Sequence, residues 1–131
     1  MSQVALSEAS LYVQEKKYDL ACERFAQVKS EYHDLLVLPE HDDFALALDS
    51  RLACALVDAG KYSEAVPIFR EIFKRNELED KQRLQVFFGV ALMRSGNAGE
   101  AQSLLFQAAK GSNTELSQTA SGYLSEIETA Q

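Results

Sequence analysis

Apolar residues recur at every third or fourth position along most of the chain, which is the period of an amphipathic helix. Ala21, Phe25 and Val28 follow this period, and Leu48 and Leu52 begin a second stretch that does. No run of alternating apolar and polar residues indicates a strand or a hairpin. The pattern therefore predicts an all-α chain of about seven helices, at residues 3–15, 18–36, 43–59, 63–75, 79–95, 98–109 and 113–129.

A six-residue segment occurs three times, each time between two predicted helices. It reads Gly-Lys-Tyr-Ser-Glu-Ala from Gly60, Gly-Asn-Ala-Gly-Glu-Ala from Gly96 and, less closely, Lys-Lys-Tyr-Asp-Leu-Ala from Lys16. The final alanines Ala65 and Ala101 are 36 residues apart, close to the ~34-residue period of helix–turn–helix repeats. The first copy precedes the second by 44 residues, which indicates an insertion after the first unit. A fixed internal period predicts stacked repeats.

The residues around these segments resemble the tetratricopeptide repeat (TPR), a family whose unit is two antiparallel helices with small residues where the helices cross. The matching residues are Ala9, Tyr12, Tyr18, Ala21 and Phe25 in the first unit, Leu52, Ala53, Leu56, Gly60, Tyr62, Ala65 and Phe69 in the second, and Phe88, Gly89, Leu92, Gly96, Ala101, Leu105 and Ala108 in the third. Glu8 stands where the family has a large apolar residue, and the family's early Trp and closing Pro are absent.

The resemblance implies a right-handed superhelical array of antiparallel helix hairpins, in a single domain over residues 1–131. Its units would cover about residues 2–36, 43–76 and 79–111, and a last helix at about 113–129 would cap the array. The first helix of each unit would line a concave groove. A protein or peptide partner is expected to bind in that groove.

Charge and composition narrow the class of partner. The chain is 47% hydrophobic and carries 20 acidic against 13 basic residues. This balance argues against nucleic acid and against an anionic membrane surface, because both attract basic proteins. No apolar run approaches the ~20 residues that span a bilayer, and no leader pattern opens the chain. Cys22 and Cys54 have neither metal nor disulfide-framework spacing, so we expect buried thiols in a cytoplasmic protein.

Two clusters could carry metal chemistry. His33 and Asp34 lie before the connector at residues 37–42, while His41, Asp42 and Asp43 lie at its end. Imidazoles and carboxylates bind divalent metals, so a metal-dependent hydrolase is one alternative. The favoured interpretation is structural, with one of the two later aspartates capping the next helix. No nucleophile elbow, phosphate-binding loop or zinc spacing is present, so we expect no enzyme, metal or cofactor.

The helix predicted at residues 79–95 is apolar on two faces. Leu84, Phe88 and Leu92 form one stripe, and further apolar residues lie beside it. A helix that is apolar nearly all round is either buried on both sides or binds a partner. The residues expected to anchor a partner are Phe87, Val90, Met93 and Val86, and those expected to orient its acidic groups are Arg83, Arg94 and Arg51.

Two interpretations of this face stay open. It could be covered by four residues of the last helix, Leu116, Tyr123, Leu124 and Ile127. Alternatively, it could be an open groove that binds a peptide or helix, or that closes in a homodimer. The clamp with which some TPR proteins bind chaperone C-termini is not expected, because only one of its positions fits among Leu6, Ser10, Arg83 and Phe87. Narrower functions of the same class are a small chaperone of a secretion system and a toxin-neutralising immunity protein.

Overall fold

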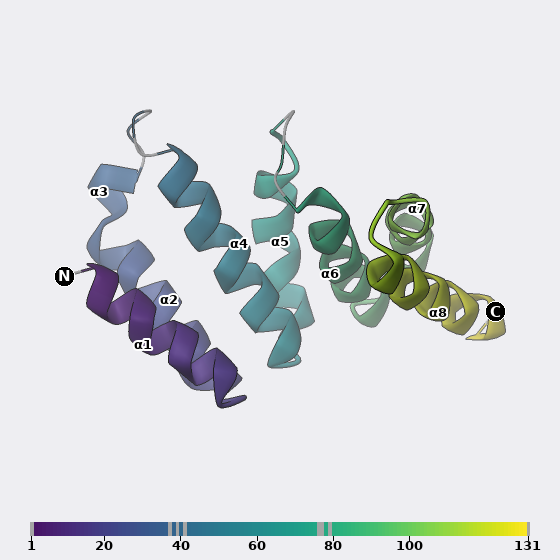
Figure 1. Ribbon diagram of the computed structural model, residues 1–131, viewed down its shortest axis with the longest axis horizontal. Helices are drawn as coiled ribbons and strands as arrows, with labels where there is room; N and C mark the ends of the chain where they lie inside the picture. The colour runs from purple at the N-terminus through teal and green to yellow at the C-terminus, as the bar shows by residue number, and fades with distance from the viewer. Residues whose placement is uncertain are drawn as a thin grey trace. The chain divides into compact units, whose positions relative to one another are not determined.

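The computed structural model describes residues 2–36, 38, 40, 42–75, 78 and 80–130, without the side chains of residues 2–6, 35, 36 and 130. Over these ranges the chain is helical and contains no strand, which confirms the predicted all-α class. The helices are α1 (Ser2–Gln14), α2 (Tyr18–Glu31), α3 (His33–Leu36), α4 (Asp42–Asp58), α5 (Tyr62–Ile72), α6 (Lys81–Arg94), α7 (Ala98–Ala109) and α8 (Thr114–Ala130) (Figure 1).

One predicted helix is divided. The sequence pattern predicts a continuous helix over residues 18–36, but α2 ends at Glu31 and the four-residue α3 follows. The backbone of Tyr32 leaves the helical region, with φ −110° and ψ 20°, and its N–H still donates to the carbonyls of Val28 and Ser30. A fixed apolar period does not reveal such a local break.

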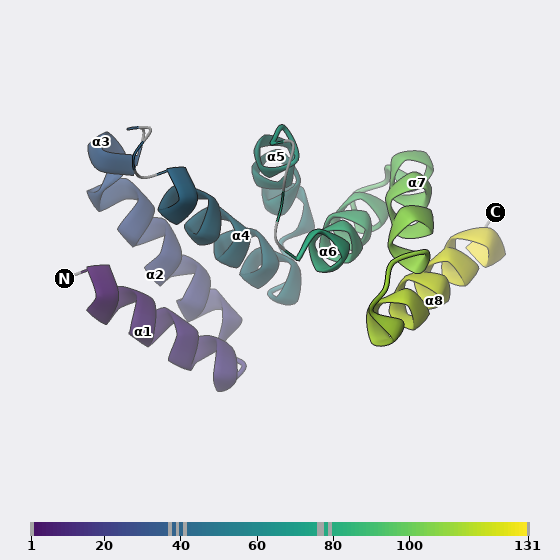
Figure 2. The ribbon, with the colours of Figure 1, turned by 45° about the horizontal axis from the view of Figure 1, so that its top comes forward.

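The chain divides into two compact units, Met1–Lys61 and Tyr62–Gln131. In the first unit α1 packs antiparallel against α2, α2 packs against α4, and α3 contacts both α2 and α4 (Figures 1 and 2). The second predicted hairpin would join α4 to α5 and therefore crosses the boundary between the units. That hairpin, the single domain and the superhelical arrangement stay predictions.

The first unit is closed by small side chains where α1 meets α2. Ala9 and Ala21 are fully buried, as the resemblance implies for a helix crossing. Phe25 and Val28 continue the buried face of α2. On α4 the buried residues are Leu48, Leu52, Ala53, Ala55, Leu56 and Val57.

The second unit is built around α6, which contacts α5, α7 and α8. The ring of Phe88 on α6 stacks on Phe69 with centroids 5.3 Å apart, and Phe73 lies at the same distance on a tilted plane. On the side facing α7, a Cβ added to Gly89 would lie 2.7 Å from Cγ of Leu105. The absence of a side chain at Gly89 is therefore what lets the fully buried Leu105 sit against the α6 backbone.

The three copies of the repeated segment form the same turn. Each begins with a residue in the left-handed region, namely Lys16 (φ 61°), Gly60 (φ 80°) and Gly96 (φ 92°). The N–H of the next residue donates to the carbonyl five positions earlier, which is the Schellman end of a helix. These bonds run from Lys17 to Tyr12 (2.7 Å), from Lys61 to Leu56 (2.8 Å) and from Asn97 to Leu92 (2.8 Å). The recurrence read from the sequence is thus a recurrence of one hydrogen-bonded helix end.

Candidate functional site

Most of the circumference of α6 is buried, because three other helices of its unit contact it. Only Lys81, Arg83 and Arg94 on this helix are exposed, and Gln82, Phe87 and Met93 are half-buried. The remaining residues, which are buried, are Leu84, Gln85, Val86, Phe88, Gly89, Val90, Ala91 and Leu92. The doubly apolar pattern therefore reflects burial over most of the helix.

Two of the expected partner anchors lie inside the protein. Val86 is 4% exposed and Val90 is 7% exposed, so neither has much surface to offer a partner. Sequence periodicity shows that a face is apolar but not how many neighbours cover it. Of the expected anchors, Phe87 and Met93 keep part of their side chains at the surface.

Arg83 and Phe87 form a pair at the surface of α6. They lie four positions apart, on the same face of the helix. The guanidinium carbon of Arg83 lies over the ring of Phe87, 5.6 Å from its centroid. Such a cation–π contact contributes about 0.5–1 kcal/mol at an exposed site. We call these two residues the Arg83–Phe87 pair.

Arg94, on the same helix, pairs with a carboxylate of α8. Its guanidinium donates two hydrogen bonds to the carboxylate of Glu126 on α8, at 2.5 and 3.3 Å. These bonds raise the pKa of Arg94 above its ordinary value, against a smaller lowering by partial burial. This ion pair joins α8 to α6, and the expected role of Arg94 toward a partner stays a prediction.

Arg51 is exposed on α4 and belongs to the first unit, whereas the Arg83–Phe87 pair belongs to the second. Its membership of the same site stays a prediction. Among the positions compared with the chaperone-tail clamp, which is not expected here, Leu6 has a side chain outside the described residues.

The last helix does contact α6, as one of the two open interpretations requires. Of the four expected contact residues, Ile127 is buried, while Leu116, Tyr123 and Leu124 are half-buried. Phe87 nevertheless keeps part of its ring exposed. The contact with α8 and a partly open Phe87 therefore coexist. The exposed residues of α8 with described side chains are polar or glycine, as a capping helix requires.

Gln82 fixes the start of α8, a role that the sequence did not indicate. Its Nε2 donates to the carbonyl of Ala108 (2.8 Å), the carbonyl of Asn113 (3.1 Å) and the hydroxyl of Ser117 (3.1 Å). Its Oε1 accepts the N–H of Asn113 at 2.9 Å. A Cβ on Gly111 would lie 2.2 Å from the Gln82 amide carbon, so a glycine there makes this approach possible. Nearby, the Asn113 side-chain Oδ1 accepts the N–H of Leu116 at 3.1 Å, but neither Gly111 nor Asn113 indicates a contact with Gln82 from the sequence alone.

The two clusters considered as an alternative metal site are not assembled in the described part of the chain. His33 is exposed at the start of α3, and His41 lies outside the described residues. Asp42 and Asp43 lie in the first turn of α4, where the helix dipole stabilises negatively charged carboxylates. Among the described residues, no group of three His, Cys, Asp or Glu side chains could hold a metal ion. The same part of the chain contains no helix long and apolar enough to cross a membrane.

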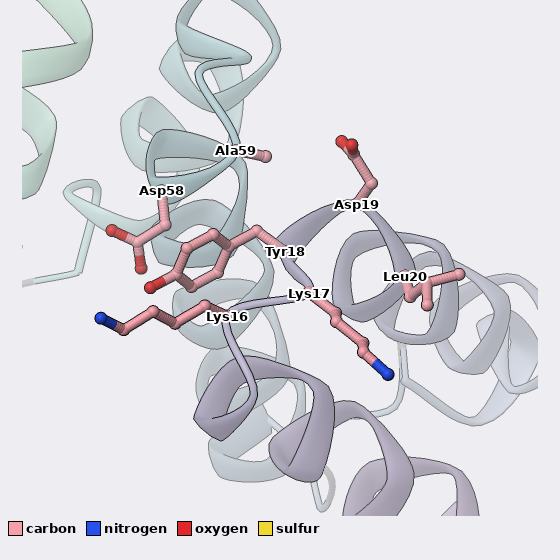
Figure 3. Close-up of a pocket in the computed structure, with 7 residues that line it drawn as sticks. All are labelled: Lys16, Lys17, Tyr18, Asp19, Leu20, Asp58 and Ala59. Carbon is pink, nitrogen blue, oxygen red and sulfur yellow. The ribbon is translucent and has the colours of Figure 1, made fainter.

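A hollow of about 390 Å³ lies in the first unit, between the α1–α2 turn and the end of α4. It is lined by Lys16, Lys17, Tyr18, Asp19, Leu20, Asp58 and Ala59. Figure 3 shows the ring of Tyr18 close to the carboxylate of Asp58, while the side chains of Lys17, Asp19 and Leu20 point away from them. Lys17 pairs with Glu15 at 3.1 Å and Asp19 with Lys61 at 3.5 Å. Lys17 and Asp19, two of the four charged side chains around the hollow, are therefore paired within the chain.

The cysteines sit differently from one another. Cys22 is buried on α2 and Cys54 is half-buried on α4, and neither forms a disulfide. The expected burial thus holds for Cys22 and only in part for Cys54.

Comparison of the chain with protein-family models and with curated proteins gives no match, so its likeness to the TPR family stays a resemblance.

Proposed function

We propose that the chain is a protein-binding module, and that the Arg83–Phe87 pair on α6 contacts a peptide or helix of a partner protein. The observation that carries the proposal is a charged guanidinium resting on a half-buried aromatic ring. Within the described residues Arg83 forms no ion pair, in contrast to Arg94 on the same helix. Tyr, Trp, Phe and Arg are the residue types enriched where proteins bind each other.

The chemistry of the pair indicates what it would bind. The free edge of the Arg83 guanidinium can donate two parallel hydrogen bonds to a carboxylate. The exposed parts of Phe87 and Met93 can pack against apolar side chains, and methionine adapts to varied shapes. Val86 and Val90 on the same helix are buried. A segment with an acidic residue beside apolar ones fits both requirements.

Photo-crosslinking tests this proposal in cells. A photoreactive phenylalanine analogue at position 87 should capture a discrete protein, and adding Arg83→Glu should abolish the capture. The matched control carries the analogue at Phe106, which is 53% exposed on α7 and lies beside Lys110. Equal capture from both positions, or persistence of the adduct with Arg83→Glu, would contradict the proposal.

The captured protein would separate narrower functions. An aggregation-prone helical client would indicate a chaperone, a toxin would indicate an immunity protein, and a second copy of the chain would indicate a homodimer. Circular dichroism of each variant shows that loss of capture does not come from unfolding. Lys81→Glu, an equal charge change at an exposed position in the first turn of α6, should leave capture unchanged.

A further inference from the structure

We draw no further inference here: the strongest candidate, the hollow between the α1–α2 turn and the end of α4, carries none, because its lining side chains point apart, two of its charges are matched within the chain and nothing in the described residues shows what would fill it.

Discussion

The α1–α2 hairpin of the first unit and the α6–α7 hairpin of the second share one plan but differ in the residues that carry it. Both place two small residues 12 positions apart, Ala9 with Ala21 and Gly89 with Ala101. Both end the first helix with the same hydrogen bonds at the turn. The backbone pattern therefore tolerates different side chains, and the difference lies in conformational strain and in how closely the helices approach.

The largest effect is expected where α6 crosses α7. Gly89→Ala gives this crossing the side chain that Ala9 already has in the first hairpin, but here Cβ would meet the buried Leu105. We expect the free energy of unfolding to fall by about 1–3 kcal/mol, although alanine favours a helix by ~1 kcal/mol. Urea unfolding followed by circular dichroism measures the change.

Two further variants control this result. No atom lies within 4 Å of a Cβ added to Gly122 on α8, so Gly122→Ala should stabilise the protein by about 0.5–1 kcal/mol. Leu105→Ala alone should lower the free energy of unfolding by about 2–5 kcal/mol. The double variant should lose less than the sum of the two single losses, because the smaller residue makes room for the added Cβ. Strict additivity would show that the two residues do not meet.

The next effect concerns the turn of the α6–α7 hairpin. Gly96→Ala places a Cβ at φ 92°, where an L-residue is strained although no neighbouring atom lies within 4 Å. We expect a loss of about 1–2 kcal/mol in unfolding free energy. Gly99→Ala, three residues later and within α7, has equal space and should not destabilise. Equal losses of unfolding free energy for Gly96→Ala and Gly99→Ala would show that backbone strain at Gly96 is not the cause.

The reverse change in the first hairpin should have the opposite sign. Lys16 already holds φ 61°, a conformation that costs a residue with a side chain more than it costs glycine. Lys16→Gly should therefore raise the free energy of unfolding by about 0.5–1 kcal/mol, measured in the same urea series. Lys17→Gly is the control, because Lys17 does not have a positive φ and should be destabilised by the added chain freedom. A destabilising Lys16→Gly would mean that the lysine side chain outweighs the strain.

The smallest effect concerns charge. After the turn of the α6–α7 hairpin, Glu100 stands where the α1–α2 hairpin has the exposed Leu20. Its carboxylate accepts two hydrogen bonds from Arg70 at 2.7 and 3.0 Å. These bonds lower the pKa of Glu100, against a smaller raising by desolvation. The stability they contribute is present above the ordinary carboxyl pKa of about 4.3 and is lost as pH falls through the lower folded value.

Glu100→Gln should therefore flatten the acid limb of the stability–pH curve slightly. Melting temperatures between neutral pH and about pH 3 measure the slope. Glu115→Gln on α8 is the control, since Glu115 forms no ion pair among the described residues. An unchanged slope for Glu100→Gln would show that the pair contributes nothing, as many exposed pairs do.

The all-α class, the helix positions and the recurring turn could be predicted because they rest on local chemistry. The apolar period sets each helix from neighbouring residues. Gly60 and Gly96 end the helices before them through their own positive φ. The break at Tyr32 could not be predicted, because no proline or glycine marks it. The helix that houses the candidate site was identified, but not the division of its residues between core and surface.

That division depends on contacts between residues far apart in the chain. Val86 and Val90 are buried whereas Phe87 is half-buried, and the apolar period does not distinguish the two cases. Arg94 reaches Glu126, 32 residues later, and Gln82 reaches Ser117, 35 residues later. Such pairs join residues too far apart in the chain for a local pattern to reveal, so the ion pair of Arg94 with Glu126 could not be predicted.

The half-exposed ring of Phe87 also gives the protein a natural place for an optical reporter. The chain contains no tryptophan, so Phe87→Trp would introduce the only indole. Its emission wavelength would follow the polarity around that single position, and the nearby Arg83 would make it responsive to an arriving carboxylate. Occupancy of this part of α6 could then be followed by the tryptophan fluorescence of the protein, without an added dye.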